Sequence, residues 1–131
     1  MNSLTIDEIK SILKLHEIWL DSGEESGEQA NFSNVKLAYH NLLGARLERA
    51  LFYKADLTET DLRKADLKEA FLSEAIMKKT FLSGSDLSKA DLSQADLEGA
   101  DLKNANLSGA NLNQTNLKDA LLDGAIIDRH I

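Results

Sequence analysis

Large apolar residues recur at every fifth position over most of this chain. The series runs from Phe32 to Ile127 without a break, and its twenty members are all Leu, Phe, Met or Ile. Two residues before each of them stands a second position, where eighteen of the twenty residues are Ala, Ser or Thr. Between the two lies Asp or Asn in twelve repeats. Residues 30–129 therefore form an internal repeat of five residues with the order small, polar, large, then two variable positions.

The period of five excludes the two commonest regular structures. Five residues advance an α-helix by about 500°, which would spread the large residues over every face. In a single strand, an odd period sends alternate large residues to opposite sides. A chain that turns a corner every five residues directs both the large and the small residues inward. A low-complexity helix rich in Leu and Ala is the alternative, and the spacing argues against it.

This repeat resembles that of the pentapeptide-repeat family, in its small cyanobacterial type. The resemblance rests on A-(D/N)-L-x-x, as in residues 90–112, and covers 100 of the 131 residues without an insertion. It implies an all-β solenoid: a right-handed quadrilateral β-helix with one ladder of Leu or Phe and one of Ala inside. Four repeats then make one coil, so twenty repeats predict five coils, with residues twenty apart stacked at about 4.8 Å. We assign residues 30–131 to this β-helix.

The first 29 residues predict an α-helical cap followed by a linker. Thr5 and Glu8 have the spacing of a capping box, and Gly23 is placed to end a helix. Apolar residues at helical spacing between them predict a helix over residues 6–21 that covers the open end of the first coil. A helix lying on a membrane surface is the alternative, but that role needs a basic polar face. Here the polar residues are mixed: Asp7, Glu8, Lys10, Lys14, Glu17 and Asp21.

Composition narrows the class of protein. The chain has no cysteine, so disulfides, thiolate metal sites and cysteine nucleophiles are excluded. Its formal charge of −7 argues against direct binding of nucleic acid, which needs clustered Lys and Arg. Neither a signal peptide nor an apolar span of membrane length is apparent, so we expect no membrane partner and a cytoplasmic location.

The residues that could carry chemistry are better explained by structure. The three histidines His16, His40 and His130 share no metal-ligand spacing. The Asp residues recur at the repeat period, which is typical of corner residues whose side chains accept hydrogen bonds from turn amides. An interior filled with Leu and Ala leaves no pocket for a small molecule. We therefore expect no enzyme activity, no cofactor and no metal site.

Apolar residues at the usually polar position suggest a contact surface. Leu51 should stack under Phe71 with Tyr53 nearby, while Ile76 and Phe81 follow on the next two sides of the same coil. These five residues predict an apolar band for a protein partner. The alternative is that their side chains simply fold flat over the corners.

The carboxyl-terminal coil predicts a second contact. Leu121, Ile126 and Ile131 gather at an end with no covering helix in this sequence, and an exposed strand edge is normally paired or blocked. We expect two copies to pair through this end as a homodimer. Repulsion among Asp119, Asp123 and Asp128 argues for a monomer instead.

These features favour a non-catalytic interaction or scaffold protein. The alternative rests on the resemblance, because some family members protect DNA gyrase with an acidic rod shaped like DNA. Residues 30–131 carry 15 acidic and 13 basic residues, which weakens that reading, although residues 85–131 carry 8 acidic and 4 basic ones. Stacking by twenty also predicts ion pairs across coils: Arg49–Glu69–Lys89, Lys78–Glu98–Lys118, Glu59–Lys79 and Lys54–Glu74.

Overall fold

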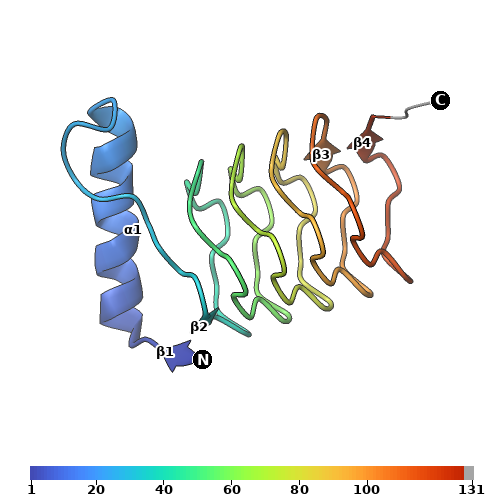
Figure 1. Cartoon of the computed structure of the whole chain (residues 1–131), viewed down its shortest axis with the longest axis horizontal. Helices are drawn as coiled ribbons and strands as arrows, with labels where there is room; N and C mark the ends of the chain where they lie inside the picture. The colour runs from blue at the N-terminus through green and yellow to red at the C-terminus, as the bar shows by residue number, and fades with distance from the viewer. Residues whose placement is uncertain (129–131) are drawn as a thin grey trace.

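The repeats wind into a solenoid with one helix packed against its first coil (Figure 1). The computed structural model describes residues 1–128. Residues twenty apart pair as parallel β-bridges, for example Leu51 with Phe71 and Phe71 with Asp91, so four repeats make one coil. The elements are β1 (Asn2–Ser3), α1 (Ile6–Asp21), β2 (Val35–Lys36), β3 (Asn106–Leu107) and β4 (Ile126–Ile127). We call residues 30–49 the first coil and residues 110–128 the last coil.

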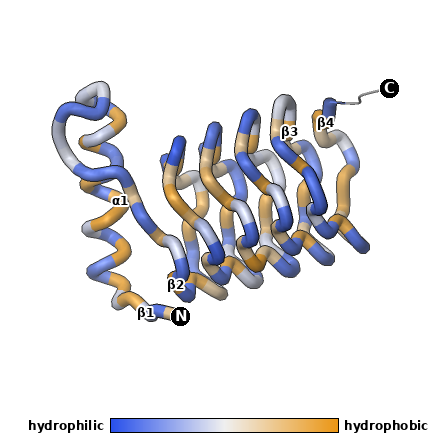
Figure 2. Tube along the Cα trace, viewed as in Figure 1, coloured by the Kyte–Doolittle hydropathy of each residue, from blue (hydrophilic) through white to orange (hydrophobic). Residues whose placement is uncertain are grey.

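Each repeat ends in a tight turn that forms the corner. The carbonyl of Phe32 accepts a hydrogen bond from the amide of Val35 at 3.1 Å, and the same bond recurs along the chain. From Asn34 to Gly124, the third residue of every such turn has a positive φ, including Lys54 at 57°. These are the φ signs of a type II turn, which reverses the chain in four residues. Hydropathy consequently alternates along each coil (Figure 2).

The two inward positions form the core as predicted. The Leu and Phe ladder is fully buried from Phe32 to Leu107, and the small-residue ladder packs beside it. Thr60 and Thr80 occupy small positions and donate their hydroxyls to the carbonyls of Leu37 and Leu57. The Ser85 hydroxyl is buried without a partner among the described residues.

The cap helix begins and ends where the sequence predicts. The amide of Glu8 donates to Thr5 Oγ1 at 3.1 Å, and the amide of Thr5 donates to Glu8 Oε1 at 2.9 Å, which completes the capping box. Ile9 is buried against the solenoid, with Ile12 and Leu13 partly buried beside it. The helix thus covers the apolar end of the first coil. No helix within residues 1–128 is long and apolar enough to cross a membrane.

Hydrogen bonds from side chains and from β1 complete the junction. β1 pairs in parallel with β2, an interaction the sequence did not predict. His16 is buried, accepts a hydrogen bond from the amide of Ala30 at Nδ1, and lies 2.9 Å from the carbonyl of Glu48 at Nε2. This pattern requires the neutral ring with its proton on Nε2. Burial lowers the pKa of His16 below its usual range, which favours the same form.

The linker after α1 turns back closely against the helix. The amide of Glu28 donates to the carbonyl of Leu15 at 3.0 Å. Gly27 has a φ of +74°, and a Cβ there would lie 2.4 Å from the Leu15 carbonyl oxygen. Only glycine fits this approach, and it directs the chain into the first repeat.

Candidate interaction surface

The polar corner residues are held by the turns, so they are not free for chemistry. Every Asp or Asn at this position accepts a hydrogen bond at Oδ1 from the amide two residues later, as Asp56 does from Thr58 at 3.0 Å. Ser and Thr hydroxyls add a second bond in several turns, such as Ser93 to Asp91 at 2.6 Å. Within residues 1–128 no group of three His, Asp or Glu residues is arranged to hold a metal. The corner carboxylates therefore serve the fold, as the spacing predicts.

The surface charges pair differently from the prediction. Arg49 and Glu69 do form the expected ion pair across coils, at 3.7 Å. The remaining cross-coil pairs are absent among the ion pairs of residues 1–128, and that part of the prediction is wrong. Asp61, Asp66 and Asp101 instead pair inside their own turn, as Asp61 does with Arg63 at 2.8 Å. Asp96 has no base in its turn and pairs with Lys78 of the preceding coil at 3.6 Å. A base two residues after the corner lies on the same turn as the carboxylate, so it reaches the carboxylate before a side chain of the next coil does.

Leu51, Phe71 and Tyr53 form the most continuous part of the predicted band. Leu51 and Phe71 are paired on neighbouring coils, and Phe71 is 46 % exposed. Tyr53 follows in the Leu51 turn, is 40 % exposed, and has Lys54 Nζ 5.3 Å from its ring centroid. We call these three residues the Leu51–Phe71 column. Their side chains offer apolar area with a charged rim, as contact surfaces do.

Ile76 and Phe81 lie on other sides of the solenoid. Phe81 is 42 % exposed and pairs with Asp61 and Asp101 on the coils before and after it. Ile76 is half-buried and pairs with Asp56 and Asp96. Each is thus an apolar residue between two Asp residues on the neighbouring coils. The five predicted residues form one column of three plus two isolated apolar side chains.

A groove beside α1 extends the Leu51–Phe71 column. It has a volume of about 500 Å³ between the helix and the first two coils. Its lining residues are Ile12, Leu15, Glu28, Gln29, Asn31 and Leu51. Leu15 is exposed on the helix beside the half-buried Leu51. The apolar stripe of the predicted helix contained Ile12 and Leu15, but the sequence did not show that this stripe is wider than the end of the coil that it covers.

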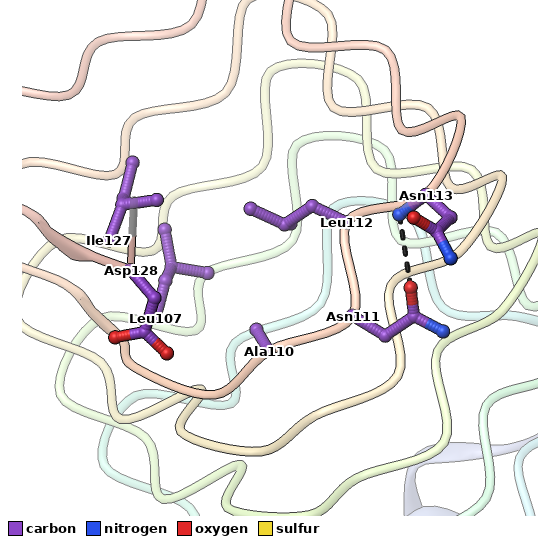
Figure 3. A pocket seen from close by; sticks show the side chains of 7 residues that line it. All are labelled: Leu107, Ala110, Asn111, Leu112, Asn113, Ile127 and Asp128. Atoms are coloured by element: carbon purple, nitrogen blue, oxygen red, sulfur yellow. Dashed lines mark hydrogen bonds between the residues drawn. The ribbon is translucent and has the colours of Figure 1, made fainter. Parts of the chain in front are cut away.

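The last coil is open, and its large residues are only half-buried. Leu121 is 49 % exposed and Ile126 is 56 % exposed, while Ile131 lies outside the described residues. A hollow of about 320 Å³ lies over the ladder there, and its side chains are shown in Figure 3. Its lining residues are Leu107, Ala110, Asn111, Leu112, Asn113, Ile127 and Asp128. Asp128 closes one corner by accepting a hydrogen bond from the amide of Gly109 at 2.6 Å.

Comparison with known proteins agrees with this architecture. The family model described as Pentapeptide repeats matches residues 30–69, 65–104 and 100–129. The chain belongs to the pentapeptide repeat family. None of the curated proteins is significantly similar to it in sequence.

Solved structures of similar proteins include plant and cyanobacterial members. A pentapeptide repeat protein from the thylakoid lumen of Arabidopsis thaliana is 30 % identical, with 72 % of this chain and 68 % of that chain covered and a TM-score of 0.68. HetL from Nostoc, described as involved in heterocyst differentiation regulation, is 38 % identical, with 76 % and 56 % covered and a TM-score of 0.55. Another Nostoc pentapeptide repeat protein is 28 % identical, with 88 % and 74 % covered and a TM-score of 0.51.

Proposed function

We propose that this chain is a non-catalytic interaction or scaffold protein that acts through the outer surface of its rod. The Leu51–Phe71 column carries the proposal, because it places the exposed side chains of Phe71 and Tyr53 beside the half-buried Leu51 on adjacent coils. Contiguous apolar area of this kind on a protein surface marks contact with another protein. The rod we envisage is the right-handed, five-coil form that the family resemblance implies, and we propose a cytoplasmic location for it.

The closely packed interior favours a role in surface binding over a catalytic role. Its ladders are closely packed from Phe32 to Leu107, and the corner carboxylates are already engaged by their turns. Small-molecule sites need concave pockets with convergent polar groups. The hollows of this rod lie instead at its two ends and beside α1. The family is generally non-catalytic, in line with this proposal.

Substitution in the Leu51–Phe71 column tests the proposal. Phe71→Asp and Phe81→Asp, singly and together, should leave the thermal midpoint nearly unchanged because both side chains are outside the core. We expect Phe71→Asp to reduce recovery of a specific partner from host extract more than Phe81→Asp does. Tyr39→Asp is the matched control, since Tyr39 is an exposed aromatic residue outside the column. Equal recovery by all variants would refute the proposal, and unfolding of the double variant would refute the outward assignment.

We also propose a homodimer that joins through the last coil. Leu121 and Ile126 are exposed there, and the Leu112 and Leu117 ladder residues are half-buried. A two-fold contact would bury this apolar edge in both copies. Sedimentation equilibrium of the native protein should give twice the mass of 14.4 kDa, and Ile126→Asp should halve it. A native mass near 14.4 kDa at high concentration and moderate salt would overturn the dimer.

The acidic carboxyl-terminal part of the chain supports a second function, that of a DNA mimic directed at gyrase or a related topoisomerase. Residues 85–131 carry 8 acidic residues against 4 basic ones. Against it, Asp96 and Asp101 are paired with Lys78 and Lys103, so their charge is partly neutralised. Supercoiling by gyrase, measured with a molar excess of this protein, distinguishes the two functions. Inhibition or protection from quinolones would favour the mimic, and unchanged supercoiling would exclude it.

A further inference from the structure

The amino-terminal segment imitates one repeat in a layer that precedes the first coil. Ser3 pairs with Lys36, which in turn pairs with Asp56 on the next coil. Ser3 therefore occupies the polar corner position of that layer, and Leu4 occupies the large position. Leu4 is partly buried against the core, as a ladder residue would be. A short extended segment can thus add to the first coil if it carries a large apolar residue after a polar one.

Among residues 1–128, the side of the coil around Asn41 has no such partner. On the next coil, the amide of Asp61 donates to the carbonyl of His40 at 2.9 Å, and the amide of Leu42 donates to the carbonyl of Asp61 at 2.8 Å. By analogy, the amide and carbonyl of Asn41 point toward the layer that contains α1. Neither makes a backbone hydrogen bond within residues 1–128. The helix leaves them free because its own backbone bonds are internal.

An apolar notch adjoins these free backbone groups. It has a volume of about 190 Å³, enough for one aliphatic side chain. Its lining residues are Ile6, Ile9, Lys10, Leu13, His40, Asn41 and Leu42. Ile6 is 63 % exposed at its rim, whereas Ile9 and Leu42 form a buried floor. A corner hollow of about 270 Å³ joins the notch to Leu4, and both hollows are lined by His40.

We propose that this notch binds an extended peptide segment of a partner protein with the order small, polar, leucine. The segment would run parallel to Asn41–Leu43, as the coils do. Its carbonyl at the small residue would accept from the amide of Asn41, and its leucine amide would donate to the carbonyl of Asn41. The leucine side chain would fill the notch between Leu42 and the helix. Strand addition of this kind draws affinity from backbone bonds and specificity from alternate side-chain pockets.

Charge narrows the sequence of this segment. The notch lining includes the basic Lys10 and contains no acidic residue, so an Asp at the polar position is favoured over a basic residue. The site is on the side of the coil opposite Asn31, the residue that pairs with Leu51 of the Leu51–Phe71 column. It is independent of the surface proposed above, and either can fail without the other.

A capped hexapeptide, Gly-Ala-Asp-Leu-Ser-Gly, is the probe, with its scrambled sequence as the control. Titration of the full chain, followed by NMR, should give saturable shifts of the Asn41 and Leu43 amides and the Ile6 and Leu42 methyl groups. Ile6→Glu should weaken binding about tenfold or more, because it places a carboxylate at an apolar rim. Ile18→Glu is the matched control, since Ile18 is an exposed residue of the same helix outside the notch lining.

A charge reversal provides a second variant if Ile6→Glu disturbs the helix. Lys10→Glu should weaken binding of the Asp peptide and improve binding of a peptide with Lys in its place. The proposal is overturned if no saturable shift occurs at millimolar peptide, if the scrambled peptide binds equally well, or if the preference is unchanged in Lys10→Glu. Shifts confined to the Leu51–Phe71 column or the last coil would also overturn it.

Discussion

The two ends of the rod solve the same problem differently. At the first coil, α1 covers the ladder, so that Phe32, Leu37 and Leu47 are fully buried. At the last coil, the corresponding Leu112, Leu117 and Ile127 are only partly buried among the described residues. The end of a β-solenoid presents apolar area together with unpaired amides and carbonyls. At the first coil, different groups cover the apolar area and pair with the free backbone amides and carbonyls.

The helix covers the apolar ladder residues, and other groups form hydrogen bonds with some of the free backbone amides and carbonyls. β1 pairs with β2, the His16 ring joins the amide of Ala30 to the carbonyl of Glu48, and the Gln29 side chain donates to the carbonyl of Arg49 at 2.7 Å. Ion pairs between Asp21 and Arg46 at 2.9 Å and between Glu24 and Arg49 at 3.6 Å lie outside this layer. Exposed ion pairs of this kind contribute little to stability. The capped end is therefore stabilised mainly by apolar burial and by hydrogen bonds to backbone groups.

Removal of residues 1–28 should have the largest effect on this comparison. It uncovers the Phe32, Leu37, Leu42 and Leu47 layer, and we expect a loss of more than about 3 kcal/mol in the free energy of unfolding, or aggregation through the exposed edge. Thermal unfolding with light scattering measures both. Removal of residues 1–4 is the matched control and should cost less, because it takes away only β1 and Leu4. A monomeric truncated protein with unchanged melting would show that α1 is no cap.

The close turn behind α1 is the next most sensitive point. Gly27→Ala should cost about 3 kcal/mol, since its Cβ would meet the Leu15 carbonyl oxygen at 2.4 Å and the Trp19 amide nitrogen at 2.6 Å. Gly44→Ala is the matched control: its φ is also positive, at +66°, but its Cβ would meet nothing within 4 Å. Its cost should be about 1 kcal/mol. Equal denaturant midpoints for the two variants would contradict this account of the linker.

The ladder itself should be less sensitive at the open end. Leu57→Ala removes a fully buried side chain and should cost about 3 kcal/mol. Leu117→Ala removes a partly buried one in the last coil and should cost about half as much. Urea unfolding of both variants compares the sites directly. If Leu117→Ala proves as costly as Leu57→Ala, the last coil is covered, and a dimer contact is the first explanation to test.

Acid should weaken the capped end through His16. Its pKa is lowered in the folded protein by burial, so the unfolded chain binds the proton more readily. The stabilisation from this site is therefore complete above the ordinary histidine pKa of about 6.5 and is lost as pH falls below that value. Urea midpoints between pH 8 and pH 5 measure the loss. His16→Gln, whose amide can both accept and donate, should flatten the dependence, and an unchanged slope would contradict the role of His16.

Periodicity predicted the repeats and the cap helix, but the contacts between them required the structure. The five-residue spacing of Leu57 and its equivalents allows one geometry, and Thr5 with Glu8 marks the helix start independently of packing. By contrast, the sequence Asn2-Ser3-Leu4 does not by itself predict a strand. The strand is defined only by its pairing with Val35–Lys36 in the structure. The sequence favours a structural or surface role for His16 but does not predict its partners, which are backbone groups 14 and 32 residues away.

The sequence predicted which apolar residues lie on the candidate surface more accurately than how these residues are arranged. Leu51 and Phe71 are adjacent because their separation equals one coil. Ile76 and Phe81 are separated from them because a step of five turns a corner. The groove at Leu15 and the notch at Leu42 depend on where α1 lies across the coil, which no short-range pattern in the sequence specifies.

Site-resolved amide hydrogen exchange of the dilute, monomeric protein tests the contrast between the ends most directly. Protection should be greatest in the middle coils, remain high at the Ala30 amide bonded to His16, and fall in the last coil around Leu117. The Asn41 amide should exchange much faster than that of Asp61, its paired residue on the next coil. Equal protection at Ala30 and Leu117, or slower exchange in the last coil than in the first, would contradict the account.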